Sequence, residues 1–235
     1  MSKPNTPIAL PPNTPATFLR HVLAHETYST TLVICGPKDD FINSVIADID
    51  TPRDLPGNKD ENIEQSELGD AEQPPRKQRD PLLIATLMQI ATSRHIRTAF
   101  VPTVTHLRAY LSTFTMARSP VSAPPVTRPQ KRPPQLLVYG FLHTHRDGSE
   151  WSAQGVGTTA ACLVEAAART GLRAAIVEPR LEMDERDAHL FEEQLPIVSG
   201  SLRKADGTWS GRTVSAKRVL GRWFTFTDKD PDECI

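Results

Sequence analysis

Short continuous runs of apolar residues alternate along the chain with stretches in which apolar residues recur every three or four positions. The continuous runs are residues 31–35, 97–101, 136–142 and 172–178. The helical spacing is found at residues 17–25, 38–46, 81–93, 105–114 and 157–170. Strands that are apolar on both faces and alternate with helices are typical of a parallel sheet covered on both sides. The pattern therefore predicts an α/β fold with a mainly parallel sheet.

The pattern changes after Pro196, where apolar and polar residues alternate. Residues 196–204, 208–219 and 222–227 are predicted to be strands joined by tight turns at 205–207 and 220–221. We expect them to form a C-terminal antiparallel meander that extends one edge of the sheet. In the last of them, the period-two rule places Trp223 on one face and Phe224 and Phe226 on the other.

Three stretches lack the large apolar side chains that a packed core requires. Residues 1–16 are rich in Pro and Thr, residues 50–79 combine Pro and Gly with many charges, and residues 117–134 are rich in Pro, Ser and basic residues. Such segments cannot bury enough surface to offset their ordering entropy. We therefore expect a disordered N-terminal segment and one domain over residues 17–235, with disordered inserts at about 50–79 and 117–134.

Composition narrows the classes of partner and compartment. A formal net charge of -1 gives no global attraction to nucleic acid or anionic membranes. The three cysteines lie far apart, which fits a reducing compartment and neither a disulfide framework nor a cysteine zinc site. No apolar run approaches the roughly 20 residues that span a bilayer, so we expect no membrane contact. Basic islands at 74–79 and 128–134 could direct nuclear import, and we expect the nucleus and/or the cytoplasm.

The first strand ends in a turn that occupies the place of a phosphate-binding loop. Such a loop needs Gly-x-x-x-x-Gly-Lys-Ser/Thr, so that backbone N–H groups, a lysine and a hydroxyl surround the phosphates. Here Gly36-Pro37 is followed by neither a second glycine nor a Gly-Lys-Ser/Thr step. Asp39 and Asp40 occupy the positive N-terminus of the next helix and would repel a triphosphate. The sequence argues against ATP hydrolysis, and we expect no cofactor.

The order of these elements resembles the RecA-like ATPase core, as found in Rad51 paralogs and in relatives that have lost ATPase activity. Residues 31–37 stand in the Walker A place and residues 136–140 in the Walker B place, and strands follow Pro196. The resemblance covers residues 17–49 and 80–228. It departs from the family where chemistry is concerned: the Walker A lysine and hydroxyl are missing, and Gly140 stands where an Asp would hold Mg²⁺. The resemblance implies a three-layer RecA-like fold that has lost its nucleotide chemistry.

What the resemblance implies for function is a non-catalytic subunit of a multiprotein complex. The first expectation is a DNA recombination and repair accessory complex of the Rad51-paralog type, similar to the Shu complex. The partner would be another RecA-like subunit in a heteromer, and DNA could be contacted through the complex. An Elongator-type RecA-like subcomplex acting on tRNA is the alternative, and a small adaptor with no nucleic-acid role is a third possibility.

Basic and aromatic residues interleave in the C-terminal strands, and this is where a binding surface is predicted. Cationic side chains can pair with phosphates, and aromatic rings can stack on bases or anchor a protein partner. An ordinary solvated edge strand protected by its charges is the alternative. The residues expected to bind a partner or DNA are Arg212, Lys217, Arg218, Arg222, Trp223 and Phe224.

Two further motifs keep an enzyme open as the rival class. His143, His145 and Asp147 resemble the start of the metal signature of metallo-β-lactamase-like hydrolases, although Gly148 replaces its last histidine. A polar loop with solvent-facing histidines is the alternative. Residues 155–159 contain two glycines at the start of a helix, where free N–H groups could bind an anion. No lysine accompanies them, and a flexible loop with a Thr cap is the alternative.

Overall fold

The computed structural model describes residues 5–25, 28–51, 80–116, 133–146, 148–180, 187–197, 202–203 and 209–227. Most of the two predicted inserts falls at 52–79 and 117–132, outside these residues, as do the basic island at 74–79 and Asp147. None of the helices within the described ranges is both long and apolar enough to cross a membrane.

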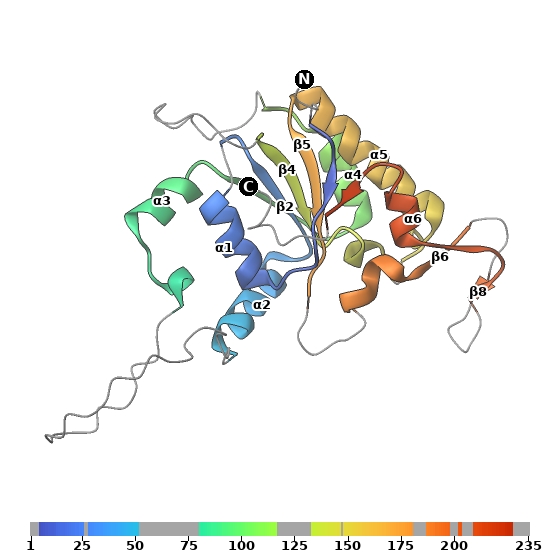
Figure 1. Ribbon diagram of the computed structural model, residues 1–235, viewed down its shortest axis with the longest axis horizontal. Helices are drawn as coiled ribbons and strands as arrows, with labels where there is room; N and C mark the ends of the chain where they lie inside the picture. Colours follow the sequence, from blue (N-terminus) through green and yellow to red (C-terminus); the bar gives the residue numbers. More distant parts are fainter. Residues whose placement is uncertain are drawn as a thin grey trace, which may run out of the picture.

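Six parallel strands form the central sheet, in the order β10-β1-β5-β4-β2-β3 (Figure 1). Four of them were predicted: β2 (Thr31–Cys35), β3 (Arg97–Val101), β4 (Gln135–Tyr139) and β5 (Arg173–Val177). Every residue of β2 and β4 is buried, as expected for central strands of a sheet that is covered on both faces. The predicted α/β class is confirmed.

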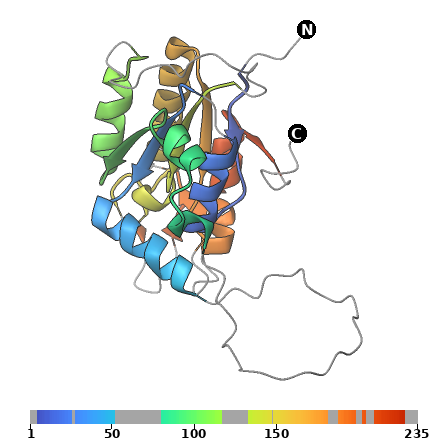
Figure 2. The ribbon, with the colours of Figure 1, turned by 90° about the vertical axis from the view of Figure 1, so that its left-hand side faces the viewer.

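Alternate residues of each strand pack into two separate cores. On one face, Val33 packs with Leu107 and Leu163, which come from helices α4 and α5. On the other, Ile34 packs with Phe18 of helix α1. Figures 1 and 2 show the resulting three layers, with α1 and α2 on one side of the sheet and α4 and α5 on the other. The bounds of these helices are α1 (Pro15–His25), α2 (Lys38–Asp50), α4 (Val104–Thr113) and α5 (Ala153–Thr170).

The connections between strands explain why the helices divide in this way. The chain moves toward one edge of the sheet from β1 to β2 to β3, and then toward the other edge from β3 to β4 to β5. Right-handed crossovers in opposite directions place their helices on opposite faces. β2 and β4 are neighbours in the sheet, and the chain leaves them toward opposite edges. In open α/β sheets, ligands bind in the crevice at the carboxyl ends of the strands at such a point.

The N-terminal segment contributes to the sheet, where a disordered segment was expected over residues 1–16. Ile8–Ala9 form β1, which pairs in parallel with both β5 and β10. The Leu10 amide continues the ladder by donating to the Ile176 carbonyl at 2.9 Å. A three-residue apolar run between prolines is too short to show a periodicity, and the partner strand decides its conformation.

Four of the C-terminal strands pair in antiparallel fashion, but they do not extend the central sheet as a meander. Instead, β6 (Gln194–Pro196) pairs with β9 (Thr213–Ser215), and β7 (Leu202–Arg203) pairs with β8 (Trp209–Ser210), in two small separate sheets. Only β10 (Thr225–Phe226) joins the central sheet, and it does so in parallel with β1.

Residues 216–219 were predicted as the end of a strand and residue 220 as part of a turn, but together they form the helix α6 (Ala216–Leu220). Ala216, Val219 and Leu220 are buried, which is the spacing of one helical face. The Ser215 hydroxyl begins the helix by accepting a hydrogen bond from the Arg218 amide at 3.3 Å. This N-cap decides between strand and helix in a segment too short for the apolar pattern to do so.

Replacing Ser215 with alanine is expected to lower the free energy of unfolding by about 1 kcal/mol, because the cap is lost. Ser112, an exposed serine inside α4, provides the control. Alanine at 112 should leave stability unchanged or raise it slightly, since alanine is the better helix former. Urea unfolding of the three proteins measures both effects. Equal stability of the Ser215→Ala variant and the unchanged protein would contradict the capping role.

The helix predicted over residues 81–93 is broken in two. A short 3₁₀ helix, η1 (Pro81–Leu83), begins at Asp80, whose carboxylate accepts from the Leu82 amide at 2.8 Å. The helix α3 (Leu87–Ser93) begins at Thr86, which forms a reciprocal capping box with Gln89. The second cap starts a new helix, so the apolar residues of the segment no longer share one face.

Candidate functional site

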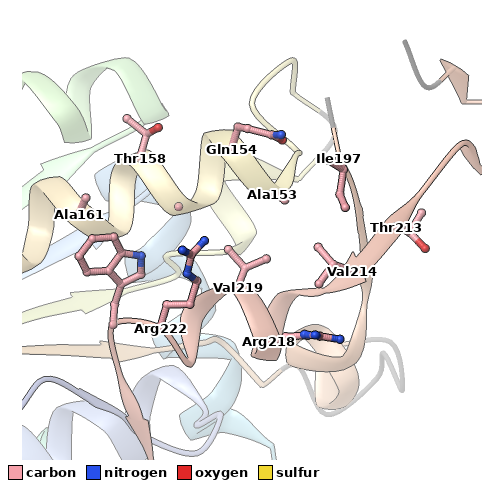
Figure 3. Close-up of a pocket in the computed structure, with 12 residues that line it drawn as sticks. Ala153, Gln154, Thr158, Ala161, Ile197, Thr213, Val214, Arg218, Val219 and Arg222 are labelled. Atoms are coloured by element: carbon pink, nitrogen blue, oxygen red, sulfur yellow. The ribbon is translucent and has the colours of Figure 1, made fainter. Parts of the chain in front are cut away.

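A groove between α5, α6 and β9 contains half of the predicted binding residues. Its volume is about 980 Å³, and we call it the α5–α6 groove (Figure 3). Ala153, Gly157 and Ala161 follow one another at intervals of four along α5 and form a row of small residues in this wall, beside Gln154 and Thr158. The remaining lining residues are Gln154, Thr158, Ile197, Thr213, Val214, Arg218, Val219, Arg222 and Trp223.

The positive charge of the α5–α6 groove comes from Arg218 and Arg222. Both side chains are exposed, and neither forms an ion pair with any residue in the described parts of the chain. Figure 3 shows them on either side of Val219, with Arg222 directed toward α5 and Arg218 toward β9. The neighbouring Lys217 is already engaged, since its ammonium lies 3.3 Å from Glu192 Oε1 and 5.7 Å from the centre of the Phe226 ring. The groove therefore presents two available guanidinium groups.

The predicted aromatic residues separate into one surface and one core residue. Trp223 lines the groove and is 39% exposed. Phe224, expected at the binding surface, is 3% exposed and belongs to the core, so that expectation needs correction. Residues 221–223 form a turn after α6, and this turn, rather than the pleat of a strand, directs Phe224 inward. Arg212 is exposed but lies outside the groove lining.

A network of polar groups holds the start of α5 against α4 and the loop before it; we call it the Arg108 network. The Arg108 guanidinium donates to Glu150 Oε2 at 2.6 Å, to the Gly155 carbonyl at 2.9 Å and to Thr159 Oγ1 at 2.9 Å. Thr159 in turn lies 2.9 Å from His145 Nε2. These contacts fix the helix whose outer face forms the groove wall.

His145 is a structural member of this network. It is fully buried, and its Nδ1 lies 2.7 Å from the Phe141 carbonyl. A carbonyl only accepts, so Nδ1 carries the proton and Nε2 accepts from the Thr159 hydroxyl. Burial lowers the pKa of His145 to about 4, which keeps the ring neutral near pH 7.

The surroundings of His145 argue against the metal site suggested by the histidine motif. Both ring nitrogens of His145 are within hydrogen-bond distance of protein atoms, and only His143 is exposed. The expectation that both histidines face solvent is therefore wrong for His145. Asp147 lies outside the described residues, and the residues that are described contain no group of three potential metal ligands.

The two glycines thought to begin α5 in a flexible loop lie inside the helix. Ser152 is its N-cap, and the Ser152 hydroxyl accepts from the Gly155 amide at 3.0 Å. The Val156 amide donates to the Ser152 carbonyl at 2.9 Å. Two of the N–H groups proposed for an anion are thus already used by the helix itself.

A smaller cleft of about 350 Å³ lies at the carboxyl ends of β2 and β4, where the sheet changes direction. Its donors do not suit a phosphate. The Gly36 amide is taken by the Val101 carbonyl at 2.9 Å, Pro37 has no N–H, and Asp40 places a carboxylate in the lining. The cleft lies beside Gly36 and Pro37, the turn that was compared with a phosphate-binding loop on the basis of the sequence.

Glu178 stabilises the other side of this cleft and was not identified from the sequence. Its buried carboxylate accepts from the Leu142 amide at 2.8 Å and the His143 amide at 3.2 Å, which shapes the turn after β4. Burial, assisted by the Glu178 charge, raises the pKa of the Cys35 thiol well above its usual value. Cys35 is therefore protonated near neutral pH and is a poor nucleophile.

The most exposed apolar side chains lie elsewhere, on η1 and α3. We call this surface the η1–α3 face. Leu87 and Met88 are 86% and 74% exposed, and neither η1 nor α3 contains a buried residue. The apolar spacing predicted one helix over residues 81–93, and the cap at Thr86 divides it. The residues of the η1–α3 face are Leu83, Ile84, Leu87, Met88 and Ile90.

Comparison with family models, with curated proteins and with solved structures finds no match for the chain.

Proposed function

We propose that the protein is a non-catalytic subunit of a multiprotein complex and that its partner is another RecA-like subunit in a DNA recombination and repair accessory complex. The observation that carries the proposal is the uncovered η1–α3 face. Soluble proteins rarely leave contiguous large apolar side chains in water, and where they do, the surface usually binds another protein. Five such side chains occur here within eight residues.

The chemistry of the face specifies what would cover it. The helix α3 contains no charged residue between Leu87 and Ser93, so a partner needs an apolar, uncharged surface rather than a complementary charge. Figures 1 and 2 show α3 beside α1, on the outside of the sheet and its helices. The adjoining residues 52–79 contain only three large apolar residues in sequence, Leu55, Ile63 and Leu68. A separate subunit is the better source of a matching surface.

The cleft between β2 and β4 supports the non-catalytic part of the proposal. The cleft is lined by Pro37, which has no N–H group, by Asp40, which repels phosphate, and by the protonated thiol of Cys35. This lining offers neither an activated thiol nor a set of donors for a phosphate group. The core of the sheet is packed, and recognition by surface residues is left as the function of the fold. The assignment to recombination and repair rests on the resemblance of residues 31–37 and 136–140 to the Walker places of RecA-like proteins.

The Leu87→Glu, Met88→Glu double variant is expected to lose the partner while remaining folded. Both side chains are exposed, so the charges cost little folding stability, but they cannot be buried in an apolar interface. The measurement is affinity purification of the tagged full chain from its own cells, followed by identification of the bound proteins. Circular dichroism checks the fold of each variant.

Trp223→Ala serves as the matched control, because it removes an exposed apolar side chain outside the η1–α3 face. It should retain the subunit bound there. A chain that purifies without a stoichiometric partner, or a double variant that keeps it, would refute the proposal. A partner of Elongator type would show that the complex acts in tRNA modification instead of DNA repair. A partner without a RecA-like core would refute the family assignment.

A further inference from the structure

We infer that the α5–α6 groove is a second recognition site, which binds an amphipathic helical segment carrying both acidic and aliphatic side chains. This inference goes beyond the proposed function, because it concerns a different surface and a different ligand chemistry. Its parts come from α5, β9, α6 and the turn after α6, so the site exists only in the folded protein.

The α5 side of the groove is shaped to receive a helix. Ala153, Gly157 and Ala161 lie on one face of α5, one helical turn apart. Small residues at this spacing leave a shallow furrow, into which the side-chain ridge of another helix can pack closely. On the opposite wall, Val214 and Val219 provide apolar surface. An amphipathic helix places its aliphatic side chains against such surfaces.

The guanidinium groups of Arg218 and Arg222 favour a ligand with acidic side chains. Arg218 and Arg222 stand on either side of Val219, so they flank the apolar surface rather than cover it (Figure 3). Glu or Asp side chains at the edges of the ligand helix could pair with them, and Arg binds carboxylates through two parallel hydrogen bonds. The groove therefore complements a ligand that is aliphatic along its centre and acidic along its sides.

Nucleic acid fits the groove less well. Proteins that hold duplex or single-stranded DNA commonly neutralise several phosphates, about 6–10 in extended sites, and stack successive bases on several aromatic rings. The groove contains two cations and one aromatic residue, Trp223, and most of its remaining lining is aliphatic or small. The chain as a whole has a formal net charge of -1 and gives no additional attraction.

A small molecule also fits less well, although the volume of about 980 Å³ lies at the upper end of the range for small-molecule pockets. Such pockets usually bury most of the ligand surface. Half of the groove's twelve lining residues are exposed, so the groove is an open surface feature. The exposed six are Gln154, Thr158, Thr213, Arg218, Arg222 and Trp223.

The inference is tested by selecting peptides from a phage-displayed random library on the purified full chain. We expect the enriched peptides to combine Asp or Glu with Leu, Ile or Val at helical spacing. A synthetic peptide of the enriched sequence should bind in fluorescence anisotropy. The Arg218→Glu, Arg222→Glu variant should weaken its affinity by about tenfold or more, since attraction becomes repulsion at both edges.

Two controls separate the groove from general charge and from nucleic acid. The Lys38→Glu, Arg94→Glu variant makes the same change in net charge at exposed residues outside the groove, and it should leave the affinity within about twofold. Labelled single-stranded (dT)20 is titrated in parallel and should bind neither strongly nor in competition with the peptide.

The inference fails if no peptide is enriched, if the enriched peptides bind the Arg218→Glu, Arg222→Glu variant equally well, or if (dT)20 binds and displaces them. It stands or falls independently of the η1–α3 face. A groove variant that still purifies with its RecA-like partner leaves the proposed function intact. Conversely, the Leu87→Glu, Met88→Glu variant should bind the selected peptide with unchanged affinity, whatever becomes of its partner.

Discussion

Replacing Gly155 with alanine is expected to destabilise the protein by about 3 kcal/mol, a large effect for one methyl group. An alanine Cβ at this position would lie 2.3 Å from the Glu150 carbonyl oxygen and 3.0 Å from one of its carboxylate oxygens. Glu150 cannot simply withdraw, because its carbonyl accepts from the Ser152 amide and its carboxylate from Arg108. The substitution would push α5 out of the Arg108 network.

Gly157 provides a matched control two residues further along the same helix. The nearest atom to an alanine Cβ at 157 is Val219 Cγ1 at 3.8 Å, an ordinary contact. Alanine there should stabilise the protein by about 0.5–1 kcal/mol, because glycine is a poor helix former. Chemical unfolding of both variants measures the difference. Similar stabilities for the two alanine variants would show that α5 is not held against Glu150 as described.

The central sheet could be predicted from the sequence because its strands are buried on both faces. Each of β2, β4 and β5 contains an uninterrupted run of apolar residues, and such a run between turn signals indicates a buried strand. Neighbouring glycines and caps then limit each element. Gly171, for example, ends α5 with a φ of 72°, a conformation that glycine adopts without strain.

The short elements β1, α6 and β10 could not be predicted in the same way. In β1, α6 and β10, the apolar pattern is too short to distinguish periods of 2 and 3.6 residues. Contacts with distant residues or a single capping hydroxyl decide the outcome. The single helix predicted over residues 81–93 failed for a similar reason, because the cap at Thr86 interrupts an otherwise helical pattern.

The sequence predicted only the C-terminal wall of the α5–α6 groove. Arg218, Arg222 and Trp223 were recognised because cationic and aromatic residues interleave near the C-terminal end of the sequence. The opposite wall, which includes Gly157, comes from a helix some sixty positions earlier in the chain and carries no charge or aromatic signal. Only the packing of α6 on α5 brings the two together. The Arg108 network was missed for the same reason, since it joins residues 42 and 51 positions apart.

The histidine motif shows how one pattern can support a reactive and a structural interpretation. Its two imidazoles differ entirely in surroundings, with His143 exposed and His145 buried in the Arg108 network. A buried neutral imidazole has a thermodynamic consequence that an exposed one lacks, because protonation then competes with folding. This difference makes the structural role measurable.

The protein is expected to lose stability as the pH falls from about 6.5 to about 4, in part because of His145. Its pKa is about 4 in the folded protein, against an ordinary value of 6.5, so the unfolded chain binds one more proton between these values. The stabilisation is complete above pH 6.5 and disappears as the pH falls to 4. A span of about 2.5 pH units corresponds to about 3 kcal/mol.

The His145→Gln variant isolates this contribution, since glutamine can donate and accept hydrogen bonds but does not titrate. Urea unfolding at pH 7.5, 5.5 and 4.5 should show the unchanged protein losing about 2–3 kcal/mol more than the variant over this range. His143→Gln, which replaces the exposed histidine, should follow the unchanged protein. If the curves of the unchanged protein and His145→Gln run parallel from pH 7.5 to 4.5, the imidazole is not held neutral by burial, and the Arg108 network does not enclose it as described.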